Sequence, residues 1–243
     1  MTGIGILGSE GRMGRAIAAL LDSERAARCA GGIGREGSPE ELARRCDVLV
    51  DFSAPDALEA HLAAARTAGT PMLVGTTGLS QAHQTLLDEA AGKIAVLQAA
   101  NTSLGVNLLA HLVREAAARL GEEWDIEIAE MHHRHKKDAP SGTALLLGEA
   151  AAEGRGTTLG EVAEQGRAGL DCERTEGAIG FASLRGGSVA GEHTVIFAGE
   201  GERLELAHRA ESREIFARGA IRAAVWLAEQ KPGRYAMADV LEL

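Results

Sequence analysis

The chain has 243 residues, which is enough for two modest domains or one large one. Hydrophobic residues make up 45% and charged residues 25%, so the composition is that of an ordinary globular protein and excludes a disordered or fibrous chain. The formal net charge is −10, so nucleic acid is not an expected partner, and an anionic substrate would need a local basic patch. The sequence has no apolar stretch long enough to cross a membrane. Its three cysteines are widely spaced and match neither a disulfide framework nor a metal site, which predicts a cytoplasmic location.

The first hundred residues predict strands that alternate with helices. Apolar runs predict strands at 4–7, 48–52, 72–75 and 94–97, and helix formers predict helices at 15–21, 55–68 and 80–91. Such alternation is typical of a parallel sheet covered by helices on both faces.

The pattern changes after a long predicted helix at 104–120. The alternating segment 125–130 predicts a half-exposed strand, and a helix is expected at 143–153. After a predicted loop at 154–176, three strands are expected at 179–184, 193–198 and 204–207, with hairpin signals at 186–187 and 199–201 and a last helix at 214–227. We therefore predict an α/β protein, with a Rossmann-type parallel-sheet domain followed by an α+β domain whose sheet is mixed or antiparallel.

A glycine motif follows the first predicted strand. The literal pattern G-x-G-x-x-G occurs at residues 3–8, but it lies inside the strand, whereas a dinucleotide motif must follow a strand and open a helix. The better candidate is Gly8-x-x-Gly11-x-x-Gly14, whose glycines permit a sharp turn, an approach of backbone to pyrophosphate and close packing of the helix. A tight turn without a ligand is the alternative, but the strand and helix on either side favour a dinucleotide site.

Two later loops leave the same end of the predicted parallel sheet, where ligands of such folds bind. They are residues 75–78 and 99–102. Together with the glycine loop they give the predicted cofactor-binding residues Gly8, Ser9, Glu10, Gly11, Arg12, Met13, Gly75, Thr76, Thr77, Ala99, Ala100, Asn101 and Thr102.

A basic cluster at residues 132–137, His-His-Arg-His-Lys-Lys, stands out in this acidic chain. A solvated loop is one alternative, and a metal site is a weaker one, because neighbouring cations would oppose a metal ion; we predict no metal. The cluster is followed by Ser141, Gly142 and Thr143 at the start of a predicted helix, where hydroxyls and unsatisfied N–H groups can bind a carboxylate. Several donors in one segment indicate an anion site for a substrate with more than one carboxylate.

The segment from Glu130 to Ala144, EMHHRHKKDAPSGTA, resembles the signature of the 4-hydroxy-tetrahydrodipicolinate (dihydrodipicolinate) reductase family, E-x-H-H-x-x-K-x-D-x-P-S-G-T-A. Further segments resemble the family in its order: GRMG at 11–14, DFS at 51–53, VGTTG at 74–78, NTSLGVN at 101–107 and GEHT at 191–194. The resemblance implies a dinucleotide-binding domain at 1–103 and 214–243, and a substrate-binding and tetramerisation domain at 104–213. It also implies a homotetramer that reduces a small cyclic dicarboxylate with NADPH or NADH, in lysine and diaminopimelate synthesis.

The resemblance also assigns roles. His132 matches a proton donor and acceptor and Lys136 a proton donor, while the substrate-binding positions match His133, Gly142 and Thr143, assisted by Ser141. An aspartate- or homoserine-type dehydrogenase is the rival within this fold, and a nucleotide sensor without catalysis is the rival from another class. The histidine–lysine signature argues against both.

One departure concerns the cofactor. The acid expected about 20 residues beyond the glycine loop would bind the ribose 2′-hydroxyl of NADH, but its position is Gly34, followed by Arg35. Because Arg35 could bind a 2′-phosphate, we predict that NADPH is accepted at least as well as NADH. The alternative is that Glu36 takes the place of the missing acid and keeps NADH preferred.

Overall fold

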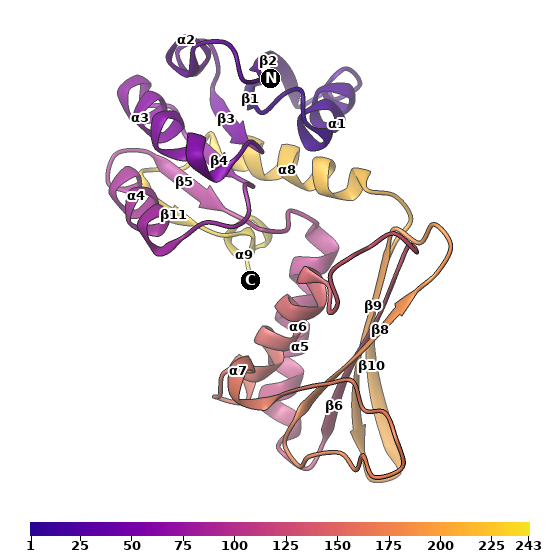
Figure 1. Cartoon of the computed structure of the whole chain (residues 1–243). Helices are drawn as coiled ribbons and strands as arrows, with labels where there is room; N and C mark the ends of the chain where they lie inside the picture. Colours follow the sequence, from indigo (N-terminus) through magenta and orange to yellow (C-terminus); the bar gives the residue numbers. More distant parts are fainter. The chain divides into compact units, whose positions relative to one another are not determined.

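The computed structural model describes residues 1–243, which form two compact units (Figure 1). One unit comprises residues 1–104 and 214–243, and the other comprises residues 105–213. The first contains a six-stranded parallel sheet and the second a mixed five-stranded sheet, which confirms the predicted fold class. No helix is long and apolar enough to span a bilayer.

The sheet of the first unit has the strand order β11-β5-β4-β3-β1-β2. The order runs outward in both directions from β1 and β3, so the connections change direction between these two strands. Ligands of open parallel sheets bind at the carboxyl ends beside such a reversal. The strands are β1 (Thr2–Leu7), β2 (Ala27–Ile33), β3 (Val48–Asp51), β4 (Met72–Val74), β5 (Ala95–Gln98) and β11 (Gly233–Tyr235).

Helices cover both faces of this sheet because its strands carry apolar side chains on both faces. One face packs against α1 (Arg12–Leu21), α8 (Glu214–Leu227) and α9 (Met237–Leu241). The opposite face packs against α2 (Pro39–Ala43), α3 (Leu58–Ala68) and α4 (Gln81–Ala91). The predicted helix at 55–68 begins with a short 3-10 turn, η1 (Pro55–Ala57), and ends at Gly69, whose φ of 72° is the left-handed conformation that favours glycine.

The second unit packs two helices on one face of its sheet. The strand order is β10-β9-β6-β8-β7, and α5 (Leu104–Leu120) and α6 (Gly142–Gly154) bury their apolar side chains against it. A shorter helix, α7 (Leu159–Val162), follows α6. The strands are β6 (Asp125–His132), β7 (Ala163–Gln165), β8 (Ile179–Arg185), β9 (Gly191–Gly199) and β10 (Glu202–Ala210).

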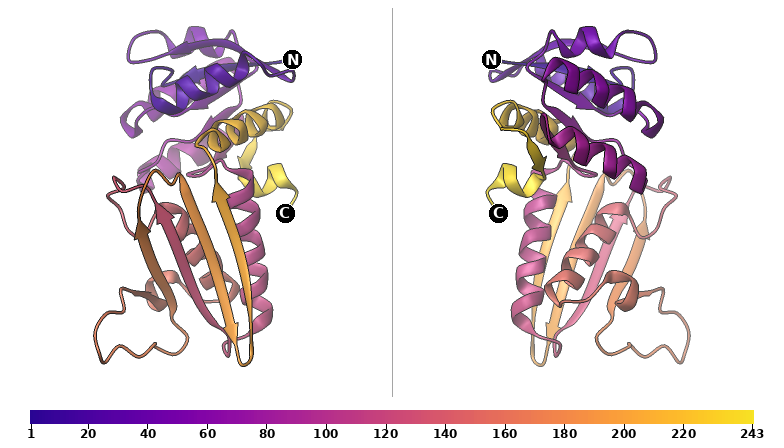
Figure 2. Two further views of the ribbon diagram at one scale, coloured as in Figure 1. Left: turned by 90° about the vertical axis from the view of Figure 1, so that its right-hand side faces the viewer. Right: turned by 90° about the vertical axis from the view of Figure 1, so that its left-hand side faces the viewer.

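The opposite face of this sheet carries no helix, as Figure 2 shows. The strand registers place mostly apolar side chains on it, with a few polar and charged ones, and all of them are partly or fully exposed. They include Glu127, Ala129, Met131, Ala182, Leu184, Thr194, Ile196 and Ala207.

The structure corrects several local predictions. The glycines at 186–187 do not close a hairpin, because β6 lies between β8 and β9 and pairs with both. The hairpin predicted at 199–201 is confirmed, since Gly199 pairs with Glu202 in the antiparallel register of β9 and β10. The segment 154–176, predicted as a loop, contains α7 and β7. The short elements α2, β11 and α9 were not predicted.

The returning helix α8 packs tightly on the end of the loop after β5. Thr102 Oγ1 donates a hydrogen bond of 2.6 Å to the carbonyl oxygen of Phe216. Gly219 in α8 lies so close to this loop that a β-carbon there would come 2.8 Å from the carbonyl carbon of Thr102. Such a contact is possible only for glycine unless the backbone moves.

We therefore expect Gly219→Ala to destabilise the first unit, although alanine is the better helix former by about 1 kcal/mol. Overpacking against backbone should lower the free energy of unfolding by roughly 1–3 kcal/mol. Gly160→Ala in α7 is the control, because a β-carbon there meets no atom within 4 Å. Urea denaturation of both variants checks the prediction, and equal stability of the two would contradict the packing described here.

Candidate functional site

The glycine loop after β1 is fixed by backbone contacts. The amides of Gly8 and Ser9 donate hydrogen bonds of 2.9 and 3.0 Å to the carbonyl oxygen of Ile33, at the end of β2. Gly8 has a φ of 82° and lies against Phe52, whose carbonyl oxygen would be 2.7 Å from a β-carbon at position 8. Of the literal pattern at residues 3–8, residues 3–7 lie within β1 and only Gly8 belongs to the loop.

The N-terminus of α1 is open to an anion. Its N-cap is Gly11, which has no side chain to accept hydrogen bonds from the first amides, and its first turn contains no acid. Gly14 lets the helix approach the loop, since a β-carbon there would lie 2.6 Å from Ser9 Cα. Arg12 is exposed in the same turn. Unsatisfied amides, the positive end of the helix dipole and an adjacent cation are the features that bind a pyrophosphate.

A buried carboxylate, Asp51, organises the neighbouring loops. Its Oδ1 accepts hydrogen bonds from the amide and the hydroxyl of Ser53, at 2.9 and 2.5 Å, and from Thr76 Oγ1 at 3.2 Å. Its Oδ2 lies 2.8 Å from Nδ1 of His61, which is also buried. Asp51 therefore ties the loops after β3 and β4 together at the carboxyl edge of the sheet. Sequence reasoning gave neither Asp51 nor His61 a role.

The other predicted cofactor residues differ in their exposure. Thr76, Ala99 and Thr102 are buried, and the hydroxyls of the two threonines bond within the protein. Gly75 packs against the ring of Phe52. The side chains exposed at or near this edge belong to Glu10, Arg12, Arg35, Thr77 and Ala100.

In the second unit, a buried glutamate holds the predicted catalytic histidine. Glu130 and His132 lie on β6, and His132 Nδ1 is 2.6 Å from Glu130 Oε2. The guanidinium of Arg185 donates to both carboxylate oxygens at 2.8 Å, and the amide of Ser141 donates to Oε1 at 3.3 Å. Burial alone would raise the pKa of Glu130, but hydrogen bonds from Arg185, His132 and Ser183 lower it to about 2. Glu130 is thus ionised at neutral pH, and His132 Nδ1 carries the proton that it donates.

The second ring nitrogen of His132, Nε2, lies beside Gly191. A β-carbon at Gly191 would lie 3.0 Å from His132 Nε2, so any side chain there would crowd this atom. The rings of His132 and His193 meet edge to face, with centroids 5.1 Å apart.

His193 connects β9 to the start of α6. Its Nε2 lies 3.0 Å from Ser141 Oγ, and the same hydroxyl caps α6 by accepting a hydrogen bond from the amide of Ala144. His193 Nδ1 is buried without a partner. Burial, followed by the nearby charge of His132, lowers the pKa of His193 to about 4, so this ring is neutral at pH 7. Gly142, next in the helix, is exposed, and a β-carbon there would meet no atom within 4 Å.

Two further basic side chains of the cluster, Lys136 and His133, contact neighbours in the same unit. Lys136 Nζ donates to both oxygens of Asp138, at 2.9 and 2.8 Å. His133 Nε2 lies 3.0 Å from the guanidinium of Arg213, and burial and the Arg213 charge lower the pKa of His133. His135 is exposed, and only its backbone amide bonds the ring of His133.

Comparison with known proteins identifies the family. Residues 2–102 match the N-terminal model of dihydrodipicolinate reductase, and residues 105–241 match its C-terminal model. The chain is 58% identical to the 4-hydroxy-tetrahydrodipicolinate reductase of Zymomonas mobilis, over 99% of this chain and 97% of the relative. It is 49% identical to that of Methylocella silvestris, over 98% and 96%. The chain belongs to the dihydrodipicolinate reductase family. It is accordingly an oxidoreductase of the lysine and diaminopimelate pathway, in a family that depends on NAD(P)H.

Solved structures agree on the fold. A dipicolinate-bound dihydrodipicolinate reductase from Paenisporosarcina sp. TG-14 matches with a TM-score of 0.78, at 20% identity and over 98% of both chains. A hyperthermophilic archaeal homoserine dehydrogenase in complex with NADPH matches with a TM-score of 0.51 at 15% identity. At these identities the likeness shows a shared architecture.

The reductase-family signature contains Glu130, but sequence reasoning assigned it no role, and it missed Arg185, His193 and Arg213. The signal for Glu130 was available, since residues i and i+2 of a strand share a face and His132 follows it by two. The partners on other strands could not be found, because sequence spacing does not give the strand register.

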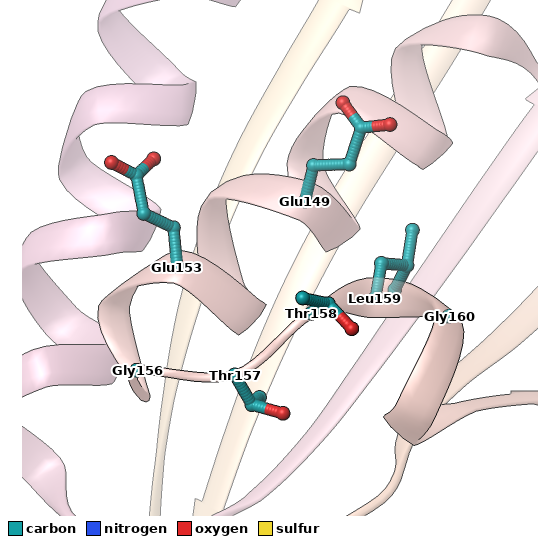
Figure 3. A pocket seen from close by; sticks show the side chains of 7 residues that line it. All are labelled: Glu149, Glu153, Gly156, Thr157, Thr158, Leu159 and Gly160. Carbon is teal, nitrogen blue, oxygen red and sulfur yellow. The ribbon is translucent and has the colours of Figure 1, made fainter.

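A separate open hollow of about 630 Å³ lies at the far end of α6, as Figure 3 shows, and no predicted site residue lines it. Its two carboxylates would repel an anionic substrate, so we do not assign the family's substrate to it. It is lined by Glu149, Glu153, Gly156, Thr157, Thr158, Leu159 and Gly160.

The low pKa of His193 predicts a pH-dependent stability. A histidine in the unfolded chain has a pKa of 6.5, whereas that of folded His193 is about 4, so protons favour unfolding. The contribution is complete above pH 6.5 and is lost as the pH falls toward 4, amounting to about 2 kcal/mol by pH 5. Urea denaturation at pH 7.5 and 5 should show His193→Gln losing less stability between the two values than the wild type. An identical loss in both proteins would contradict the assignment.

Proposed function

We propose that this chain reduces 4-hydroxy-tetrahydrodipicolinate, by way of dihydrodipicolinate, to tetrahydrodipicolinate, with His132 and Lys136 as its proton-transferring residues. The observation that carries the proposal is the buried Glu130–His132 pair beside the open start of α6, within a cluster of cations. A cyclic dicarboxylate needs such a combination of anion-binding groups and acids.

The substrate carboxylates are bound at two kinds of group. The start of α6 offers Gly142 and Thr143, and the space above Gly142, which no protein atom fills, leaves room for a carboxylate against the backbone. The second carboxylate is assigned to the guanidinium of Arg213 and the ring of His133, which lie 3.0 Å apart. Ser141 assists by holding the helix start in place through its bonds to Ala144 and His193.

The protons come from two residues that carboxylates orient. Reduction of a conjugated imine sends electron density toward the ring nitrogen, which must receive a proton. His132 keeps Nδ1 bonded to Glu130, so Nε2 is the nitrogen available to exchange a proton with the substrate. Lys136 is held by Asp138 and supplies positive field and a proton. The ionised Glu130 carboxylate fixes the orientation and tautomer of the His132 ring.

The dinucleotide, NADPH or NADH, is assigned to the first unit, and when bound it supplies the hydride. The uncapped start of α1, Arg12 and the close approach at Gly8 and Gly14 fit its pyrophosphate. The loops at 75–77 and 99–102, at the same edge of the sheet, are assigned to the rest of the cofactor.

We also propose that four copies assemble through the sheet of the second unit. The face that carries Ala129, Met131, Leu184 and Ile196 has no helix over it and mixes apolar with charged side chains. A broad exposed face of this composition is suited to a symmetric protein interface. The mass in solution, measured by light scattering, tests this.

His132→Ala and Lys136→Ala should each lower kcat by roughly 10²–10⁴-fold, because general acid catalysis contributes about that much. His135→Ala is the matched control and should be mild, since its ring is exposed and not tied to the carboxylates. The assay follows oxidation of NADPH or NADH, with substrate made by purified synthase from pyruvate and aspartate semialdehyde. Near-normal turnover of Lys136→Ala would remove its catalytic assignment, and an inactive wild type would overturn the proposed reaction.

Planar ring dicarboxylates should compete with the substrate, whereas matched ring monocarboxylates should bind roughly ten- to a hundred-fold more weakly. Loss of one charge-assisted hydrogen bond costs about 1.5–3 kcal/mol. The dipicolinate named in the Paenisporosarcina structure is such a dicarboxylate. Inhibition constants for dipicolinate and picolinate give the comparison, and equal values would contradict binding at two anchors.

A further inference from the structure

The end of β2 lacks the side chains that would normally meet the adenosine of a dinucleotide. Position 34, where an acid would bind the ribose hydroxyls, is glycine, and so is position 32. Ile33 between them uses its carbonyl oxygen to hold the glycine loop, through the amides of Gly8 and Ser9. The glycine loop is therefore fixed directly against the end of β2.

Side chains from that loop occupy the space that the two glycines leave. Ser9 lies over Gly32, where a β-carbon would be 2.6 Å from Ser9 Cβ. Glu10 lies over Gly34, where a β-carbon would be 2.6 Å from Oε2 and 2.7 Å from Oε1 of its carboxylate. The carboxylate of Glu10 thus stands where the side chain of residue 34 would begin.

The Glu10 carboxylate is exposed and available to a ligand. None of the ion pairs of this unit includes it, although Arg12 follows it by two residues and Arg35 adjoins Gly34. Its position depends on the backbone bonds of Gly8 and Ser9 rather than on a charged partner.

We propose that Glu10, from the glycine loop, replaces the missing acid of β2 and selects NADH over NADPH. Its carboxylate accepts hydrogen bonds from the adenosine ribose hydroxyls of NADH and repels the 2′-phosphate of NADPH. The inference rests on the proposed binding of a nicotinamide dinucleotide to this unit. It replaces the expectation that NADPH is accepted at least as well as NADH, and it gives the acid's role to Glu10 rather than to Glu36.

The same geometry changes what a substitution at Gly34 would do. A glutamate there would meet the Glu10 carboxylate at its first side-chain carbon, and two like charges would share one place. Gly34→Glu alone should therefore not improve NADH binding. In a Glu10→Gln background, by contrast, the carboxylate introduced at position 34 restores the missing charge.

The test measures dissociation constants of NADH and NADPH by calorimetric titration, without turnover, for the wild type, Glu10→Gln and the control Glu36→Gln. We expect the wild type to bind NADH more tightly, and Glu10→Gln to shift the ratio of the two constants toward NADPH by about ten- to a hundred-fold, the worth of one charge-assisted bond. Glu36→Gln should leave the ratio unchanged, and Glu10→Gln with Gly34→Glu should shift it back toward NADH. Thermal unfolding confirms that each variant is folded.

A wild type that prefers NADPH, or a ratio unchanged in Glu10→Gln, would overturn the role of Glu10 while leaving dinucleotide binding intact. A shift in Glu36→Gln alone would assign the acid to Glu36 and overturn it equally. If the wild type binds neither nucleotide, the proposed dinucleotide site fails, and the role of Glu10 fails with it.

Discussion

The ionised carboxylate of Glu130 is the constraint on which the second unit depends. A charge removed from water is tolerated only when its hydrogen bonds are satisfied, and here Arg185, His132 and the amide of Ser141 satisfy it. Each bond fixes something that chemistry needs: the tautomer of His132, the end of β8 and the start of α6. The carboxylate that orients the histidine thus also positions the helix start to which we assign the substrate.

Most of the fold could be predicted because its elements carry local signals. The helices at 104–120 and 214–227 have the predicted bounds, since apolar periodicity and helix formers define them. The order of strands could not be predicted in the same way. The glycines at 186–187 have hairpin chemistry, but the pairing energy of β6 with both β8 and β9 decides the sheet, and that energy is a property of the assembled unit.

In the candidate site, too, local sequence patterns predict some residues, whereas the strand order of the sheet determines the others. A continuous signature identified His132, Lys136 and the start of α6, because these residues lie in one short segment that runs from the end of β6 to α6. The sheet register supplied what the signature lacked, since it pairs His132 with Arg185 on one neighbour of β6 and Glu130 with His193 on the other. Partners more than 50 residues apart are set by this register and by no local pattern.

The glycine loop illustrates a further limit of reasoning along the chain. The rule places the acid by its sequence distance from the glycine loop, about 20 residues, which falls at the end of β2. A ribose hydroxyl can bind any carboxylate that lies within hydrogen-bond distance, whichever segment carries it. Two glycines at the end of β2 remove its side chains and so let Ser9 and Glu10 lie over it. The absent side chain at position 34 is then matched by a carboxylate from an adjacent loop, at the point where that side chain would begin. A missing acid in the sequence is for this reason not evidence for a missing acid in the site.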